Sequence, residues 1–119
     1  MLKLERYEDI YKELKTYYDN PKTCLPEIAI NYFIAESKFK GNKPDEIKIN
    51  NKILERKEMY ENDVVAAAYA LIDNKREAFD YLRKAINEDT LLKYSVRDWP
   101  AFERYFDDPK FKKIVGLTN

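Results

Sequence analysis

Histidine is absent from this sequence of 119 residues, and cysteine and glycine are scarce. Without histidine the chain lacks the usual general base near neutral pH, the Ser-His and Cys-His nucleophile pairs, and the commonest zinc ligand. The single Cys24 cannot form an intrachain disulfide or a multi-thiolate metal site, and we expect a small, partly buried side chain there. The two glycines, Gly41 and Gly116, cannot supply a phosphate-binding loop. These absences predict a protein that is not an enzyme and has no catalytic residues, no metal and no cofactor.

Net charge and long apolar runs are missing as well. Lysine and arginine number 22 and aspartate and glutamate number 22, so no overall field favours nucleic acid or an anionic membrane. The short basic stretches KFKGNK and KFKK each contain an aromatic residue, but nearby acids balance them, which indicates solvated faces. No run of 18 apolar residues occurs, and the start MLKLERYEDI lacks the apolar core of a signal peptide. We therefore expect a soluble, cytoplasmic protein that binds neither nucleic acid nor membrane.

Apolar residues at helical spacing are what the sequence does contain. The hydrophobic content of 45% and the charged content of 37% are typical of a soluble, mostly helical protein, and the length fits one domain over residues 1–119. Spacings of three and four residues predict a helix over residues 1–20, which Pro21 ends. Its apolar face is formed by Leu4, Tyr7, Ile10, Tyr11, Leu14, Tyr17 and Tyr18.

A second helix follows, with either Thr23 as its N-cap or Pro26 in its first turn. The next segment, residues 44–58, fits two structures. Its alternating isoleucines are typical of a strand hairpin, whereas its Pro-Asp-Glu start and many helix formers favour a helix. We prefer the helix, because nothing else in the sequence supplies partner strands.

Two further helices are predicted over residues 63–73 and 75–88. The connection between them is so short that they must lie antiparallel and adjacent. Near the C-terminus, Asp98 and Asp108 are each followed within two residues by a proline, which predicts N-caps of two short final helices. We expect the aromatic residues of these helices to plug the core: Trp99, Phe102, Phe106 and Phe111.

Residues 62–90 resemble one tetratricopeptide repeat (TPR), whose skeleton reads W-x2-L-G-x2-Y, then A-x3-F, then a proline. The matching positions here hold Asn62, Val65, Ala66, Tyr69, Ala78, Leu82 and Thr90. A further small position of the family falls on Ala85. Small residues at such positions let two helix axes approach closely. The tryptophan and the closing proline of the family are replaced by Asn62 and Thr90, so the resemblance rests on the small residues and on the side chains that fill the space beside them.

The ending RDWPAFERYFDDPKFKKIV is similar to the D-D-P-x-F ending of bacterial repeat proteins of this kind. Together the two resemblances cover residues 62 to about 115, and they imply an all-α fold. In that fold antiparallel helix hairpins stack as a short, right-handed, TPR-like superhelix with capping helices. The implied parts are an N-terminal capping helix (1–20), a degenerate hairpin (25–58), the TPR-like repeat (60–90) and C-terminal capping helices (97–116).

The resemblance implies a module that binds a peptide or a partner protein in a concave groove, or that binds a second copy of itself. The groove-facing residues implied for the partner are Tyr60, Asp63, Ala67, Ala70 and Leu71. Family members that grip a C-terminal carboxylate use a lysine and an asparagine where this repeat has Asp63 and Ala67, so it supplies no such clamp. The face is small, apolar and mildly acidic, which suits an apolar or basic segment. An open face also implies that Ala67→Leu costs little, whereas Ala66→Leu and Ala78→Leu overpack the hairpin.

A dedicated immunity or inhibitor protein, which neutralises one toxin or enzyme by direct binding, is the alternative function. Small helical proteins without catalytic groups suit that role, and nothing in the sequence separates it from a general interaction module.

Overall fold

Helices are the only regular elements in the described part of the chain, which in this computed structural model comprises residues 4–20, 22 and 24–117. The prediction of an all-α fold is therefore confirmed. In chain order the elements are α1 (Leu4–Tyr18), α2 (Pro26–Lys40), α3 (Glu46–Lys52), the 3-10 helix η1 (Leu54–Met59), α4 (Asn62–Leu71), α5 (Lys75–Glu88), α6 (Leu92–Val96), the 3-10 helix η2 (Pro100–Tyr105) and α7 (Pro109–Ile114).

The first two helices, α1 and α2, form an antiparallel hairpin. Their contact is aromatic: the rings of Tyr18 and Tyr32 stack with centroids 4.1 Å apart, and those of Tyr11 and Phe39 lie 5.5 Å apart. The structure thereby corrects the predicted hairpin over residues 25–58, since α1 and not the segment after α2 packs along α2. The predicted roles of Pro21 and Thr23, and of the Leu4 side chain, lie outside what the structure describes.

Both ends of α2 follow from its sequence. Pro26 occupies the first turn, as one of the two alternatives predicted, because its missing N–H and fixed φ suit that position. Gly41 ends the helix with φ of 67°, and its N–H donates to the carbonyl of Ser37. A glycine enters this left-handed conformation without a steric cost.

The segment 44–58, for which the sequence leaves a strand hairpin or a helix open, is helical, as we preferred. The helix is broken into α3 and η1 at Ile53. Asp45 caps α3 by accepting a hydrogen bond from the backbone N–H of Lys48 at 3.2 Å. A buried carboxylate joins α3 to α2: Glu36, only 6% exposed, accepts from Lys48 Nζ at 3.0 Å and from the Tyr32 hydroxyl at 3.0 Å. A buried charge needs such partners to offset its desolvation.

Helices α4 and α5 form the second hairpin, with the bounds that their sequence predicts to within two residues. Asn74 caps α5 by accepting from the Glu77 N–H at 3.3 Å, directly after the turn. Ala66 and Ala78 are fully buried and Ala85 is 2% exposed, as expected of a close contact between helices. Every alanine of the chain is in fact buried, so alanine here marks tight packing.

The C-terminal elements fold back under the α4–α5 hairpin. Phe102 and Phe111 are fully buried and stack with centroids 5.9 Å apart, while Trp99 and Phe106 pack partly buried around them, so the predicted aromatic plug exists. Burying one phenylalanine completely stabilises the fold by about 1.5–3 kcal/mol. Asp108 caps α7 as predicted, accepting from two backbone N–H groups.

The predicted cap at Asp98 is wrong, because the residue before η2 is Trp99, and no side chain caps that helix. Trp99 has extended backbone with φ of −74° and ψ of 122°, which leaves Asp98 outside the helix and exposed. Pro100 does begin η2, so the prediction of a helix here is confirmed by its proline and not by the predicted cap.

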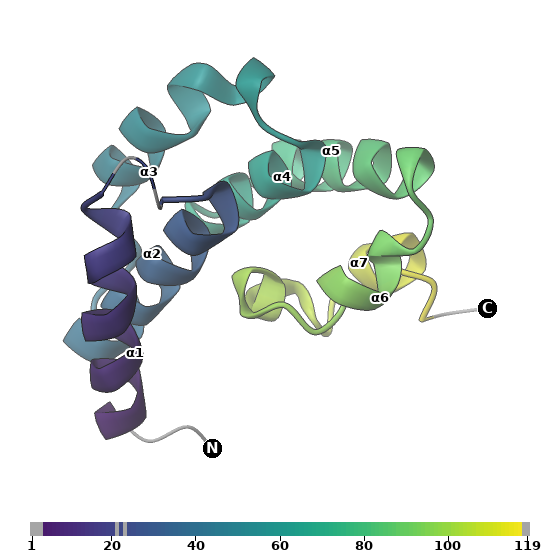
Figure 1. Cartoon of the computed structure of the whole chain (residues 1–119). Helices are drawn as coiled ribbons and strands as arrows, with labels where there is room; N and C mark the ends of the chain where they lie inside the picture. Colours follow the sequence, from purple (N-terminus) through teal and green to yellow (C-terminus); the bar gives the residue numbers. More distant parts are fainter. Residues whose placement is uncertain (1–3, 21, 23, 118–119) are drawn as a thin grey trace.

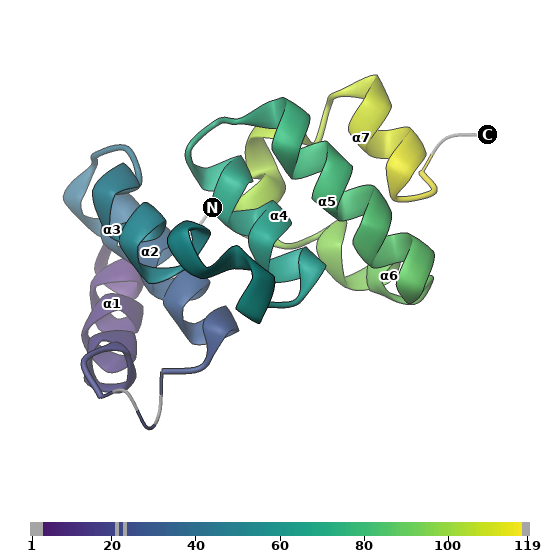
Figure 2. The same cartoon turned by 90° about the horizontal axis from the view of Figure 1, so that it is seen from above.

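The helices are arranged as an arch (Figure 1). The α1–α2 hairpin forms one side, α4 and α5 run across the top, and α6, η2 and α7 form the other side. Seen from above, α7 lies beside α5, and the segment containing η2 passes beneath α4 (Figure 2). Helix α4 is thus enclosed by α2, α5 and η2. Among the described residues no helix is both long and apolar enough to cross a membrane.

Candidate functional site

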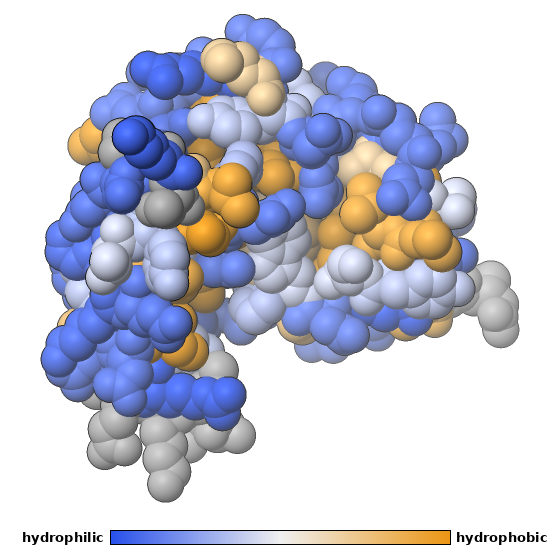
Figure 3. Space-filling view, viewed as in Figure 1, coloured by the Kyte–Doolittle hydropathy of each residue, from blue (hydrophilic) through white to orange (hydrophobic). Residues whose placement is uncertain are grey.

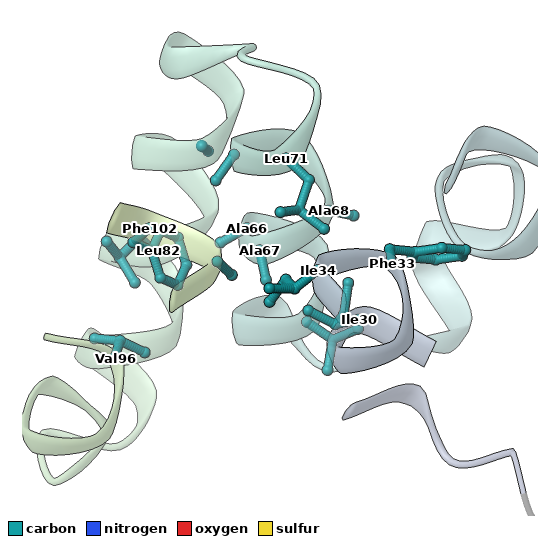
Figure 4. Close-up of a cluster of buried hydrophobic side chains, with 14 of the residues drawn as sticks. Ile30, Phe33, Ile34, Ala66, Ala67, Ala68, Leu71, Leu82, Val96 and Phe102 are labelled. Carbon is teal, nitrogen blue, oxygen red and sulfur yellow. The ribbon is translucent and has the colours of Figure 1, made fainter. Parts of the chain in front are cut away.

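The face of α4 that the sequence predicts to be an open groove is buried. Ala67 and Ala70 are fully buried and Leu71 is 7% exposed. Figure 4 shows the reason: Ala67 points toward Ile34 of α2, and η2 lies on the other side of α4. The prediction that these residues line an open concave face is therefore wrong, because two elements already cover it.

The other two predicted residues, Tyr60 and Asp63, reach the surface in part. Tyr60 is half-buried, and its hydroxyl donates to the carbonyl of Lys52 at 3.1 Å, which ties the end of η1 to α3. Asp63, in the first turn of α4, is half-buried as well, and it lines a surface groove. Of the five predicted residues, Asp63 is thus the one whose side chain is placed to meet a partner.

The groove beside Asp63 consists of two adjoining hollows of ≈500 Å³ and ≈230 Å³ that share Glu27, Asp63 and Leu92. It is bounded by the N-terminal turns of α2 and α4, the C-terminal turn of α5, α6, and the segment before η2. We call it the acidic groove. It is lined by Glu27, Asn31, Glu61, Asn62, Asp63, Ala85, Glu88, Asp89, Leu92, Ser95, Val96, Asp98, Trp99 and Pro100.

Six carboxylates and no lysine or arginine line the acidic groove. In the described part of the chain none of the six forms an ion pair, although other carboxylates there pair with a lysine or an arginine. Like charges gathered without counter-charges repel one another and reduce stability. The six residues are Glu27, Glu61, Asp63, Glu88, Asp89 and Asp98.

Helix stability explains some of these acids but not all. Glu27 and Asp63 stand in the first turns of α2 and α4, where the helix dipole favours a negative charge. Glu88 stands in the last turn of α5, where the dipole disfavours one, and no basic residue shares that turn. The amide of Asn62 donates to Glu88 and holds the carboxylate at the groove. The helix dipole therefore does not explain the charge of Glu88, whose carboxylate forms this bond between the end of α5 and the start of α4.

The floor of the acidic groove is apolar. Val96 is buried, and Leu92 and Trp99 are half-buried between the acids. The indole Nε1 of Trp99 donates to Asn31 Oδ1 at 3.0 Å, which fixes the ring against α2. Next to the groove, Leu91 is 69% exposed. The space-filling view shows apolar surface gathered over the start of α6, bordered by hydrophilic side chains (Figure 3).

The groove differs from a metal site. Across the described ranges, no three histidine, cysteine, aspartate or glutamate side chains stand close enough together to hold a metal ion. The carboxylates instead line the groove from three helices, α2, α4 and α5, and from three connecting segments. Carboxylates dispersed in this way are complementary to a ligand whose positive charges are also dispersed along its length.

Comparison with known proteins finds no matching family model, no matching curated protein and no matching solved structure. The TPR resemblance of residues 62–90 therefore stays a prediction, and the function has to be argued from the groove itself.

Sequence reasoning missed most of the acidic groove. It placed Asp63 on a binding face, but it interpreted Asp98 as a helix cap and Trp99 as part of the core plug. Glu88 carried a signal that could have been used, since an acid in the last turn of a predicted helix opposes the helix dipole, and no lysine or arginine falls in that turn. The others stand in helix starts and loops, where acids are common, so nothing local marks them.

Proposed function

We propose that the chain is a non-catalytic protein-interaction module whose acidic groove binds a basic segment of a partner protein. The observation that carries the proposal is the set of six carboxylates without an ion pair in the described structure, around a groove that no lysine or arginine lines. A partner's lysines or arginines would relieve the repulsion among these carboxylates. Complementary charge also speeds the encounter of two proteins and selects the partner.

The floor of the groove adds a requirement for apolar side chains. Leu92 and Trp99 offer apolar surface between the acids, and the face of an indole ring also attracts a lysine or arginine side chain. The proposed ligand is therefore a segment in which basic residues alternate with apolar ones. A purely hydrophilic basic chain would use the carboxylates but leave the floor in contact with water.

The architecture that we propose for this module is TPR-like. Its support is the α4–α5 hairpin, in which Ala66, Ala78 and Ala85 are all buried at the positions where the family has small residues. In the proposed arrangement the binding groove lies at the N-terminal end of α4 and not along its middle. Helix α2 and η2 cover the middle, whereas Asp63 at the start of α4 stays accessible.

Fluorescence anisotropy with labelled peptides tests the proposal. We expect a peptide of alternating lysine and leucine to bind saturably, and its glutamate–leucine counterpart not to bind at this groove. Neutralising Glu88→Gln together with Asp98→Asn should weaken binding of the basic peptide by roughly 5- to 30-fold, since exposed ion pairs contribute up to about 1 kcal/mol each. The double variant Glu13→Gln with Glu58→Gln, at exposed positions outside the groove, removes the same charge and serves as control.

Two outcomes contradict the proposal. One is that the basic peptide fails to bind at all. The other is that the control variant weakens binding as much as the groove variant, because the interaction would then follow net charge and not the groove.

The same carboxylates favour a second candidate, a dedicated inhibitor that covers a cationic surface of one toxin or enzyme. The two functions differ in affinity and selectivity. Affinity purification at rising salt distinguishes them: an inhibitor retains one stoichiometric partner after the salt has screened exposed charges, whereas an adaptor loses several weak partners. If the protein remains a monomer that retains no partner at any salt concentration, both candidates fail.

A further inference from the structure

A second groove lies between α5 and α7, and its charge is opposite to that of the acidic groove. It has a volume of ≈580 Å³, and its lining includes Arg83, Ile86, Lys110, Lys113 and Ile114. No acidic residue lines it. We call it the basic groove.

Two of its three cations have no ion-pair partner in the described part of the chain. Lys110 and Lys113 both belong to α7, and a spacing of three residues places them on one face of that helix. Arg83 pairs with Asp80 at 3.3 Å, but both side chains are about half-exposed, so the pair holds it weakly. Three positive charges thus converge on one surface hollow that no acidic residue lines, and only Arg83 has an ion-pair partner among the described residues.

We propose that the basic groove binds an acidic, amphipathic segment of a partner protein. Ile86 and Ile114 supply apolar surface between the cations, which fits an apolar side chain flanked by carboxylates. The assignment is independent of the proposed function, because it uses different residues and the opposite charge. The last turns of α5 separate the two grooves: Ala85 and Glu88 line one and Ile86 lines the other. The chain can therefore hold segments of opposite charge side by side.

A protein segment suits the basic groove better than a nucleic acid does. Single-stranded nucleic acids bind through aromatic side chains that stack on bases, and no aromatic residue lines this groove. A long polyanion would also meet the repulsion of the neighbouring carboxylates of the acidic groove. A short acidic segment avoids that repulsion because it ends within the basic groove.

The test is an anisotropy titration with a labelled peptide that has leucine at helical spacing and glutamate elsewhere. We expect saturable binding that weakens as salt is added. Lys110→Glu with Lys113→Glu should reduce the affinity at least tenfold, whereas the matched reversal Arg6→Glu with Lys22→Glu, at exposed positions on the other side of the molecule, should change it less than twofold. Circular dichroism of each variant verifies that it is folded.

Three results would overturn the inference: no saturable binding of the acidic peptide, equal weakening by both charge reversals, or tighter binding of a single-stranded oligonucleotide than of the peptide. The acidic-groove variant Glu88→Gln with Asp98→Asn separates the two proposals, since it should leave the acidic peptide bound and weaken only the basic one. If the lysines were only solvated surface, their reversal would change affinity no more than the matched reversal does.

Discussion

Replacing Ala67 by leucine probes how closely α4 is enclosed. Ala67 is fully buried, with Ile34 of α2 facing it, and η2 packs on the same helix. Leucine adds three carbon atoms where neither neighbour leaves room, so side chains must leave their preferred rotamers or the helices must move apart. Overpacking of this kind destabilises a core by about 1–3 kcal/mol.

Urea unfolding followed by far-UV circular dichroism measures the effect. With a denaturant dependence of about 2 kcal/mol per molar urea, the expected loss lowers the unfolding midpoint by about 0.5–1.5 M. Because every alanine of the chain is buried, the control has to replace another residue. Thr16→Leu on the exposed side of α1 adds similar apolar bulk and should change the free energy of unfolding by less than about 0.5 kcal/mol.

The result that refutes this reasoning is a variant Ala67→Leu as stable as Thr16→Leu. Position 67 would then be open, as the TPR resemblance implies, and α2 and η2 would not cover α4. Ala66→Leu at the contact with α5 should be destabilised in either case, so it indicates whether the assay responds to overpacking.

Two further substitutions test contacts that hold the C-terminal elements in place. The hydrogen bond from Lys75 is the main cause that lowers the pKa of Asp108 below its usual 3.8. The charge of Asp108 therefore stabilises the fold above that pH, and this contribution is lost as the pH falls through the lowered pKa. The free energies of unfolding of Asp108→Asn and of the natural protein, measured by urea titration, should differ most at neutral pH, and a difference that grows toward acid would contradict this. Burial and a hydrogen bond to Asp73 at 2.9 Å raise the pKa of Tyr105, so its hydroxyl stays protonated and stabilising below about pH 10. Tyr105→Phe should lower the free energy of unfolding by about 0.5–1.5 kcal/mol at neutral pH. An unchanged free energy of unfolding would mean that water replaces the hydrogen bond without loss.

The sequence predicted most of the longer helices because their signals are local, whereas the short α6 and the break between α3 and η1 were not predicted. Asn74 and Asp108 cap helices by bonds within three residues, and Gly41 and Pro26 act within one turn. The α4–α5 hairpin followed from a connection too short for any other arrangement. The α1–α2 hairpin was missed because nothing local selects the partner of α2. Aromatic stacking across the two helices decides it.

The candidate site was predicted far less well, for a physical reason. A small residue such as Ala67 is compatible with an open groove and with a tight contact, and only the elements packed against it decide which one forms. The carboxylates of the acidic groove come from three helices and three connecting segments, and most have an ordinary local explanation. Their convergence depends on the C-terminal segment folding back under α4, which no spacing in the sequence encodes.

Trp99 allows the proposed binding of a basic segment in the acidic groove to be tested in the unlabelled protein. It is the single tryptophan of the chain, and it lies in that groove. Addition of a tryptophan-free peptide of alternating lysine and leucine should change its emission and protect it from acrylamide quenching. The protection should saturate at the peptide concentrations at which anisotropy reports binding, and it should weaken in the variant Glu88→Gln with Asp98→Asn. If the basic peptide binds but leaves the emission and the quenching of Trp99 unchanged, the peptide binds elsewhere, and the proposal that the acidic groove holds it is wrong.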